Sequence, residues 1–203
     1  MPRALARLPF TLLLEASILC VALSLGLFDP EVGASWRERE GFGWPSVVEG
    51  RFHTLVTSTF LVDDAWQWAR IALMLAWTVG LLEWRAGTGR AAWIYAATTV
   101  ASCLAAAAAQ GVAAAFAGAH LAFAQSRDVG ASAGAYGCLG ALLPTLPPRW
   151  RTLFTWLVLA FLAFKALVFP TPSSDAVHAV ALALGYALGA SGKQPTSARR
   201  AAA

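Results

Sequence analysis

The residues with the clearest capacity for chemistry begin with a serine in a stretch of small side chains. Ser132 lies in the sequence GASAGAYG, residues 130–137, at the head of an apolar segment. Gly130 gives the backbone the freedom to turn from a loop into a helix just before the serine. We therefore expect Ser132 near a helix start, where unsatisfied N–H groups and the positive end of the helix dipole lie. A serine there can be an N-cap or packing residue, or a nucleophile whose oxyanion those N–H groups stabilise.

A nucleophilic serine requires a base, and the chain has three histidines, His53, His120 and His178. His178 is the preferred candidate because it lies about one turn into an apolar segment, where an ionisable group is a functional hypothesis by default. His120 is the main rival base, but it follows an alanine tract, and a loop there would hold an imidazole less firmly than a helix. The residues alone leave both interpretations of Ser132 open, packing or a Ser/His dyad.

Small residues follow both candidates at helical spacing. Tyr136 and Gly140 recur every four residues after Ser132, and Gly185 and Gly189 lie on the face that begins at His178. Helices lined by small residues can approach closely in a membrane. The glycines that we expect to pack these helices are Gly134, Gly137, Gly140, Gly185 and Gly189. This packing would place Ser132 and His178 at one depth, with Tyr136 one turn below the serine to buttress the imidazole.

The composition indicates a membrane protein that positions these residues on helices. Of the 203 residues, 58% are hydrophobic and 13% are charged, against about 25% charged residues in soluble domains. A span needs about 20 mostly apolar residues. Six segments qualify as candidate spans: about 9–28, 65–83, 91–117, 130–147, 152–169 and 174–190. We therefore expect an all-α polytopic membrane protein, with one domain over 1–190 and a disordered basic tail over 191–203.

The basic residues predict the orientation of the chain in the bilayer. With the amino terminus in the cytoplasm, every inner segment is basic, as the positive-inside rule requires. The carboxyl terminus is then also cytoplasmic, and the protein is expected to be a multi-pass protein of the plasma (inner) membrane. The net charge of +4 is explained by this topology. The chain shows no basic and aromatic platform for nucleic acid, and the lipid bilayer is the expected surrounding.

Several charged residues fall within or beside the candidate spans. Glu15 lies inside the first span, which is costly for a carboxylate unless it faces protein or water. Arg70 and Lys165 are interpreted as interfacial anchors, because their long stems can reach the headgroups. Asp175, one turn before His178, could orient the imidazole or cap the helix, and the cap is favoured. The cysteines show no metal-binding or disulfide spacing, and no metal or cofactor is expected.

Taken in order along the chain, these residues resemble the rhomboid family of intramembrane serine proteases, over roughly residues 50–190. Gly130-Ala131-Ser132 fits the first three positions of the family's G-x-S-G motif, and Tyr136 and Gly140 fall where the family has a tyrosine and a packing glycine. His178 with Gly185 fits the start of the H-x-x-G-x-x-x-G pattern. Two further stretches are similar to family motifs, namely Gly80-Leu81-Leu82-Glu83 with Gly87 and Arg90, and Thr54-Leu55-Val56-Thr57-Ser58.

The resemblance implies a six-helix core, a first loop that dips into the membrane, and a Ser132/His178 dyad. It also implies supporting roles near the oxyanion for Gly130, Ala133, Tyr136 and Gln67. The chain departs from the family pattern at three places. Ala133 stands where the motif ends in glycine, His53-Thr54 stands where the family has Trp-Arg, and the second helix offers Gln67 or Trp68 and Ile71 or Ala72 in place of His and Asn.

The sequence therefore carries two function hypotheses. The first is a serine endopeptidase that hydrolyses peptide bonds of transmembrane protein substrates with Ser132 as nucleophile and His178 as base. The alternative is a catalytically inactive rhomboid-like protein that binds membrane-protein clients, which the missing oxyanion ligands and Ala133 favour. A transporter or channel is disfavoured because polar residues do not line several spans.

Overall fold

The computed structural model describes residues 7–117 and 122–191, and the candidate base His120 and the tail from residue 192 lie outside them. Within these ranges the chain is helical, with one isolated bridge between Phe42 and Asp128 and no strand. The expectation of an all-α chain is thus confirmed. The elements are α2 (Pro9–Leu25), α3 (Pro30–Glu40), α4 (Trp44–Val48), α5 (Thr54–Thr57), η1 (Ser58–Phe60), α6 (Ala65–Ala86), α7 (Thr88–Ala117), α8 (Ala122–Gln125), α9 (Ser132–Leu142), η2 (Leu143–Thr145), α10 (Pro148–Val168) and α11 (Pro172–Ser191).

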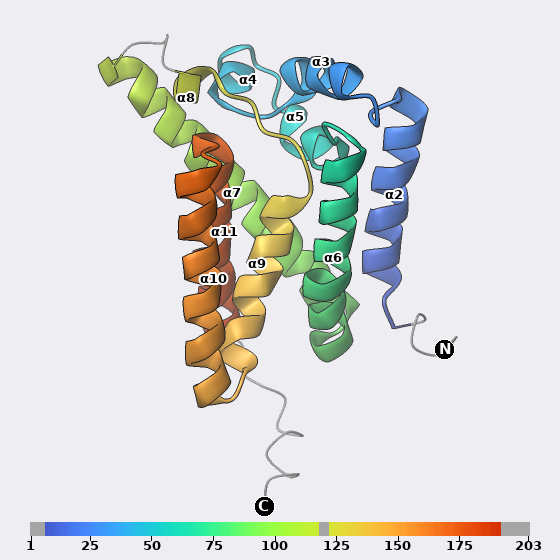
Figure 1. The fold of residues 1–203 in the computed structure, drawn as a ribbon, viewed down its shortest axis with the longest axis vertical. Coiled ribbons are helices and arrows are strands. Elements are labelled where there is room, and N and C mark those ends of the chain that lie inside the picture. The colour runs from blue at the N-terminus through green and yellow to red at the C-terminus, as the bar shows by residue number, and fades with distance from the viewer. Residues whose placement is uncertain (1–6, 118–121, 192–203) are drawn as a thin grey trace, which may run out of the picture.

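The helix α9 lies at the centre of the bundle (Figure 1). Every residue from Ala133 to Leu142 is buried, because α6, α7 and α11 all pack against this helix. The helix is rich in glycine and alanine, so its neighbours approach it closely on every side. A helix enclosed by protein does not need the length or the bulky apolar side chains of a helix that faces lipid.

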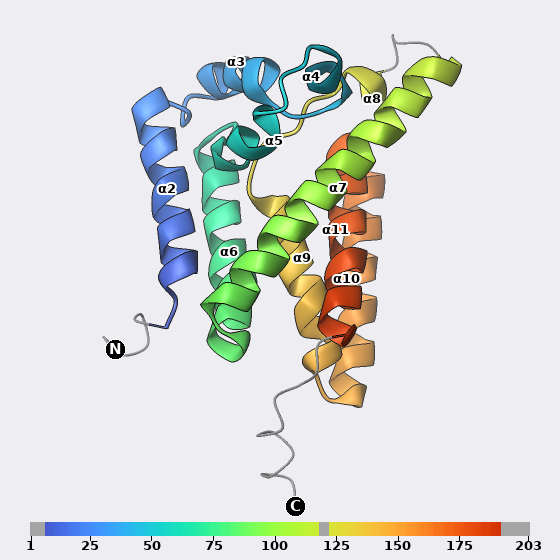
Figure 2. The ribbon, with the colours of Figure 1, turned by 180° about the vertical axis from the view of Figure 1, so that it is seen from behind.

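Helices at the edge of the bundle are less buried than α9. The helix α10 has no buried residue and contacts only α11 and η2 substantially. The helix α2 lies on the other side of the bundle, next to α6, and α7 crosses the back of the molecule diagonally (Figure 2). The short helices α3, α4 and α5 gather at one end of the bundle, and α2 begins and α11 ends at the other end (Figure 1).

Length and composition identify fewer crossings than the six expected. The helix α10 and residues 88–116 of α7 are each long and apolar enough to cross a bilayer. A third crossing is allowed if α2 and α3, which meet at a bend of 108°, are taken as one broken segment. The helices α2 and α9, with 17 and 11 residues, are short for a span of about 20 residues.

A buried carboxylate joins α2 to α6. Glu83 is 1% exposed and accepts hydrogen bonds from the backbone N–H groups of Phe10 and Thr11, both at 2.9 Å. The hydroxyls of Thr11 and Thr88 donate to the same carboxylate at 2.7 and 2.8 Å. The charge therefore occupies the positive end of α2, where anions are stabilised, and it fixes the start of that helix against α6.

Candidate active site

Gly130 turns the chain into the helix that carries the candidate nucleophile. Its φ of 109° lies in a region that residues with a side chain rarely adopt, as the sequence predicts for this glycine. The helix α9 then starts at Ser132, and its cap residue Ala131 makes no side-chain capping bond. Ser132 is therefore not an N-cap, and the N–H groups of the first turn have no side-chain partner.

Ser132 and His178 are brought together by α9 and α11. The Oγ of Ser132 lies 2.8 Å from Nε2 of His178, which is hydrogen-bond distance. The imidazole is 7% exposed and stacks on Tyr136, with ring centroids 4.3 Å apart and an interplanar angle of 29°. The hydroxyl of Ser174 also lies 3.5 Å from Nε2. This geometry matches the arrangement of a serine nucleophile and its base.

The two helices meet through glycine. A methyl group added to Gly185 would lie 1.9 Å from the carbonyl oxygen of Gly137, and one added to Gly189 would lie 2.4 Å from that of Ala141. A methyl group on Gly140 would lie 2.2 Å from the carbonyl oxygen of Leu182. No real side chain tolerates such distances to backbone atoms, so the separation of α9 and α11, and with it the dyad distance, depends on these glycines.

The opposite side of α9 packs on α7. Added methyl groups on Gly134 and Gly137 would lie 2.4 Å from the ring of Tyr95 and 1.9 Å from the hydroxyl of Thr98. Ala133, which stands where the family motif has glycine, is buried in a small cluster with Ala106 and Val177. The methyl group of Ala133 therefore fills space between α7 and α11.

The chain that leads into α9 is held along its length. The amide of Gln110 on α7 is fully buried, lies 3.0 Å from the carbonyl oxygen of Ser126, and accepts a hydrogen bond from the N–H of Trp44 at 2.8 Å. Asp128 exchanges two backbone hydrogen bonds with Phe42. Two further hydrogen bonds hold the residues just before Ser132. The N–H of Gly130 donates to the carbonyl oxygen of Ser58 at 2.8 Å, and the hydroxyl of Tyr95 donates to the carbonyl oxygen of Ala131 at 3.2 Å.

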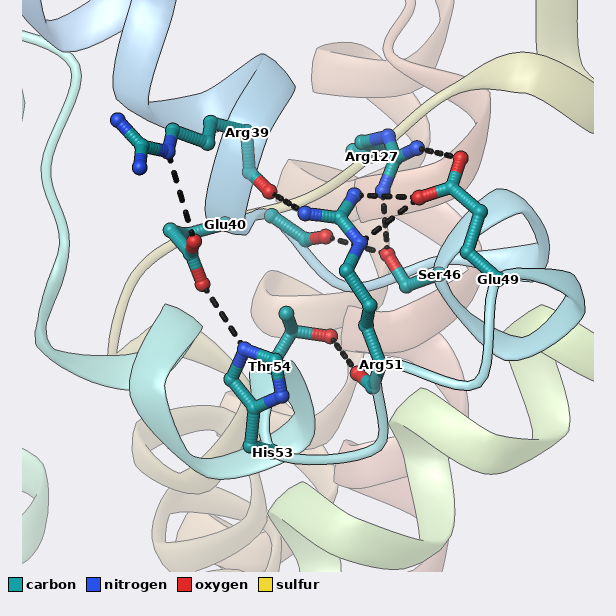
Figure 3. A network of polar contacts seen from close by, with 9 residues as sticks. Arg39, Glu40, Ser46, Glu49, Arg51, His53, Thr54 and Arg127 are labelled. Carbon is teal, nitrogen blue, oxygen red and sulfur yellow. Dashed lines mark hydrogen bonds and ion pairs between the residues drawn. The ribbon is translucent and has the colours of Figure 1, made fainter.

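Residues 29–64, between α2 and α6, supply much of this support. They are named the outer segment after the side of the membrane on which the basic residues of the sequence predict them. Figure 3 shows its polar network. Arg127, just before the site, donates to Ser46 at 2.6 Å and pairs with Glu49 at 2.7 Å, and Arg51 pairs with the same carboxylate at 2.7 Å. His53 contacts Glu40 at 3.2 Å in this network, so it is not placed to serve Ser132.

Asp175 does not contact the imidazole of His178. Its carboxylate accepts the backbone N–H of Thr171 at 2.9 Å and pairs with Lys165 of α10. The cap interpretation of Asp175 thus fits the structure better than the orienting one, and Lys165 ties α10 to the start of α11.

The Nδ1 atom of His178 is buried and has no hydrogen-bond partner among the described residues. Arg70 lies with its guanidinium over the ring of Trp66, 5.9 Å from the centroid.

Two residues of α6 lie next to Gly130, two positions before Ser132. A methyl group added to Gly130 would lie 3.0 Å from Ile71 Cδ1 and 4.0 Å from Gln67 Nε2. This identifies Gln67 and Ile71 as the residues next to the site. The Oε1 of Gln67 accepts the N–H of Asp63 at 2.5 Å, and Nε2 makes one long contact of 3.4 Å to the Asp63 carboxylate. The Nε2 atom carries two hydrogens and makes only this one contact among the described residues, so at least one amide hydrogen of Gln67 has no partner there.

A small cavity of about 20 Å³ lies near the starts of α9 and α11, and neither Ser132 nor His178 lines it. Its lining includes Gly130, Ala133 and Val177, which are chain neighbours of Ser132 and His178, together with Gln110 and Asp128. The volume is large enough for one water molecule. Burial raises the pKa of Asp128 to about 6. The folded state thus favours the protonated carboxyl, whose contribution to stability is greatest in acid and is lost as the pH rises through that value.

Three residues that support the site, Tyr95, Gln110 and Arg127, are not marked by any motif in the sequence. Gln110 could have been suspected of a structural role, because it is a single polar side chain in an alanine tract. Tyr95 and Arg127 have no spacing that would have pointed to their contacts with Ala131 and Ser46. Among the described residues, no group of His, Cys, Asp and Glu is arranged to hold a metal ion.

Comparison with known sequences identifies one family. The model of the family described as Rhomboid domain matches residues 49–194, which is more than half of the chain. This range includes Ser132, His178 and the packing glycines. A search of curated proteins found no matching relative.

Proposed function

Because the chain belongs to the rhomboid family, we propose that it is an intramembrane serine protease with a Ser132/His178 dyad. The observation that carries this proposal is the 2.8 Å contact between Oγ and Nε2 in a family whose chemistry is intramembrane proteolysis. A hydroxyl alone is a weak nucleophile, and a base at this distance activates it. The proposed substrates are peptide bonds in transmembrane segments of other proteins.

The proposed reaction has two stages. The Oγ of Ser132 attacks the scissile carbonyl carbon while Nε2 of His178 accepts the hydroxyl proton. Nε2 then gives this proton to the leaving amide nitrogen, the C–N bond breaks, and an acyl-enzyme ester remains. In the second stage His178 accepts a proton from water, the resulting hydroxide adds to the ester carbonyl, and the proton returns to Oγ as the ester breaks. The stack on Tyr136 keeps the imidazole in place throughout.

The oxyanion is proposed to be stabilised by the backbone at the start of α9. The N–H groups of the first turn carry no capping side chain, and the helix dipole places positive potential there. Gln67 is proposed as the side-chain donor, through the amide hydrogen that makes no short bond. Ile71 cannot donate, so one of the two positions that the family resemblance assigns to side-chain ligands lacks one.

The second candidate function is a rhomboid that holds membrane proteins without cutting them, and Ile71 is the observation that favours it. Loss of one oxyanion donor typically costs on the order of 10²–10³ in rate, which slows cleavage without changing how clients bind. Both candidates share one proposed topology: six membrane crossings with both termini in the cytoplasm. The short helix α9 can cross at reduced length because protein surrounds it.

The test is cleavage of a single-span peptide, labelled at both ends, by the purified protein in lipid vesicles. We expect cleavage by the wild type and loss of at least about 10³-fold in rate with Ser132→Ala or His178→Ala. Ser35→Ala, a change of the same kind in the outer segment, is the matched control and should cut normally. Equal rates for wild type and Ser132→Ala would contradict the proposal, and peptide binding without cleavage by either would support the second candidate.

A further inference from the structure

Asp63, in the outer segment just before α6, is held by the helix α3. Its Oδ2 atom accepts a hydrogen bond from Nη1 of Arg37 on α3 at 2.7 Å, and both side chains are partly shielded from solvent. The backbone of α3 touches the same residue, because a methyl group added to Gly33 would lie 2.0 Å from the carbonyl oxygen of Asp63. The helix α3, at the end of the bundle where α6 begins (Figure 1), therefore fixes both the backbone and the carboxylate of Asp63.

Asp63 in turn holds the side-chain amide of Gln67, in the first turn of α6. The N–H of Asp63 donates to Oε1 of Gln67 at 2.5 Å, and Nε2 of Gln67 lies 3.4 Å from the same Oδ2 atom that accepts Arg37. The backbone donor decides which end of the amide is the oxygen, since Nε2 in that place would set two donors against each other. The bond at Oε1 alone would let the amide pivot, so the carboxylate sets the direction of Nε2.

The ion pair with Arg37 suits the carboxylate to this role. Burial raises the pKa of Asp63, and the guanidinium of Arg37 opposes this rise. Arg37 therefore favours the ionised carboxylate, one oxygen of which can accept from two donors. The guanidinium also compensates a negative charge that would otherwise lie one amide away from the proposed oxyanion and oppose its formation.

We propose that Asp63 is a positioning residue, held by Arg37, that aims the remaining amide hydrogen of Gln67 at the oxyanion. A methyl group on Gly130 would lie 4.0 Å from Nε2 of Gln67, so this hydrogen starts beside the turn that leads to Ser132. A donor fixed in advance stabilises an oxyanion without reorganising in the transition state. The inference rests on the proposed function, and it adds that the helix α3 sets the direction of the side-chain donor.

The test begins with kcat and KM in the vesicle cleavage assay, because an interaction made only in the transition state changes kcat and not KM. Asp63→Ala should lower kcat on the order of tenfold and leave KM within about twofold of wild type. Asp63→Asn keeps an oxygen that can accept from both neighbours, so it should recover most of the loss. Glu38→Ala, which removes an exposed carboxylate of α3, is the matched control and should cut like wild type.

A double-mutant cycle separates positioning from a purely structural role. In the Gln67→Ala protein, Asp63→Ala should change kcat by less than about twofold, because no donor remains to be positioned. Arg37→Gln should follow the same pattern, whereas Arg39→Gln, the same change on the exposed surface of α3, should have no effect in either background. A loss from Asp63→Ala that is as large in the Gln67→Ala protein as in the wild type would overturn the proposal. Unchanged kcat in Asp63→Ala would also overturn it.

A second measurement follows the amide of Gln67 without any cleavage. NMR of the protein with isotope-labelled glutamine in detergent micelles detects this side-chain amide, and the signal lost in Gln67→Ala identifies it. We expect the signal to move toward that of free glutamine in Asp63→Ala and to stay in place in Glu38→Ala. An unmoved signal in Asp63→Ala would overturn the positioning role even if the protein cuts. A moved signal, in a protein whose wild type does not cut, would support the positioning role and contradict the proposed function alone.

Discussion

The contact of α9 with α11 and the outer segment are held by different forces, although both determine where Ser132 lies. Between α9 and α11 the backbones touch through glycines, and the Ser132–His178 bond is the one side-chain hydrogen bond that joins them in the described residues. The outer segment is held by charged and amide side chains around Arg127 and Gln110. The separation of α9 and α11 is set by shape and tolerates no added atom. The position of the outer segment is set by electrostatics, so its stability should depend on salt.

The largest effect is expected from an added methyl group between the helices. Gly185→Ala would place Cβ 1.9 Å from the Gly137 carbonyl oxygen, so α11 must move and carry His178 away from Ser132. A displacement of about 1 Å can cost on the order of 10²-fold in rate, which the vesicle cleavage assay would measure. Gly89→Ala is the control, because nothing lies within 4 Å of the added group. Equal activity of both variants would show that shape does not set the dyad.

Removal of the buried amide tests the outer segment. Gln110→Ala leaves the Trp44 N–H and the Ser126 carbonyl without their partner, at an expected cost of about 3 kcal/mol. This corresponds to a fall of roughly 6–12 °C in the unfolding temperature, which a thermal melt in detergent can measure. The exposed Gln125 provides the matched control. An unchanged unfolding temperature for Gln110→Ala would show that the chain into α9 is held without this amide.

A smaller effect is expected from loss of the aromatic stack. Tyr136→Ala removes the ring that lies 4.3 Å from the imidazole of His178, and stacking of this kind can contribute about 1.4 kcal/mol, which is about a factor of ten. We expect about a tenfold fall in kcat with little change in KM. Tyr136→Phe keeps the ring and should stay within about twofold of wild type. A tenfold loss with Tyr136→Phe would assign the effect to the hydroxyl instead of the stack.

The smallest effect is expected from an exposed ion pair. Glu49 bridges Arg51 and Arg127, and its side chain is 47% exposed. Glu49→Gln should lower the unfolding temperature slightly at low salt, because exposed ion pairs contribute little to stability, and the difference from wild type should disappear in about 1 M NaCl because salt screens such pairs. Glu38→Gln, which changes an exposed carboxylate of α3, is the comparison. A difference that persists in high salt would mean that this network is not electrostatic.

The same contrast explains how much the sequence could predict. The spacing of Ser132, Tyr136, Gly140, Gly185 and Gly189 follows a helical period, so the packed face and the approach of His178 were predictable. The contacts of the outer segment join residues far apart in the chain, such as Ser46 and Arg127, and no period relates them. The register of α6 against Gly130 was predictable only to within one residue, and in the structure Ile71 and Gln67 are the residues of α6 that lie next to this glycine.

The assignment of membrane crossings shows a further limit of the sequence. Apolar content predicted six segments, but length and composition identify only α7 and α10 as crossing helices on their own. Alanine and glycine give α9 a lower hydropathy than a leucine-rich helix would have. These small residues suffice in α9 because its neighbours are protein. A hydropathy count cannot distinguish such a helix from a soluble one, and only the enclosure of α9 by α6, α7 and α11 shows how it is accommodated.

The most direct test of the central claim is covalent labelling of Ser132 by a fluorophosphonate probe, mapped by mass spectrometry. A serine reacts with such a probe when a neighbouring base activates it, so the readout does not require the natural substrate. We expect labelling of Ser132 in the wild type and its loss in His178→Ala. A folded wild-type protein that remains unlabelled, or equal labelling in His178→Ala, would contradict a Ser132/His178 dyad.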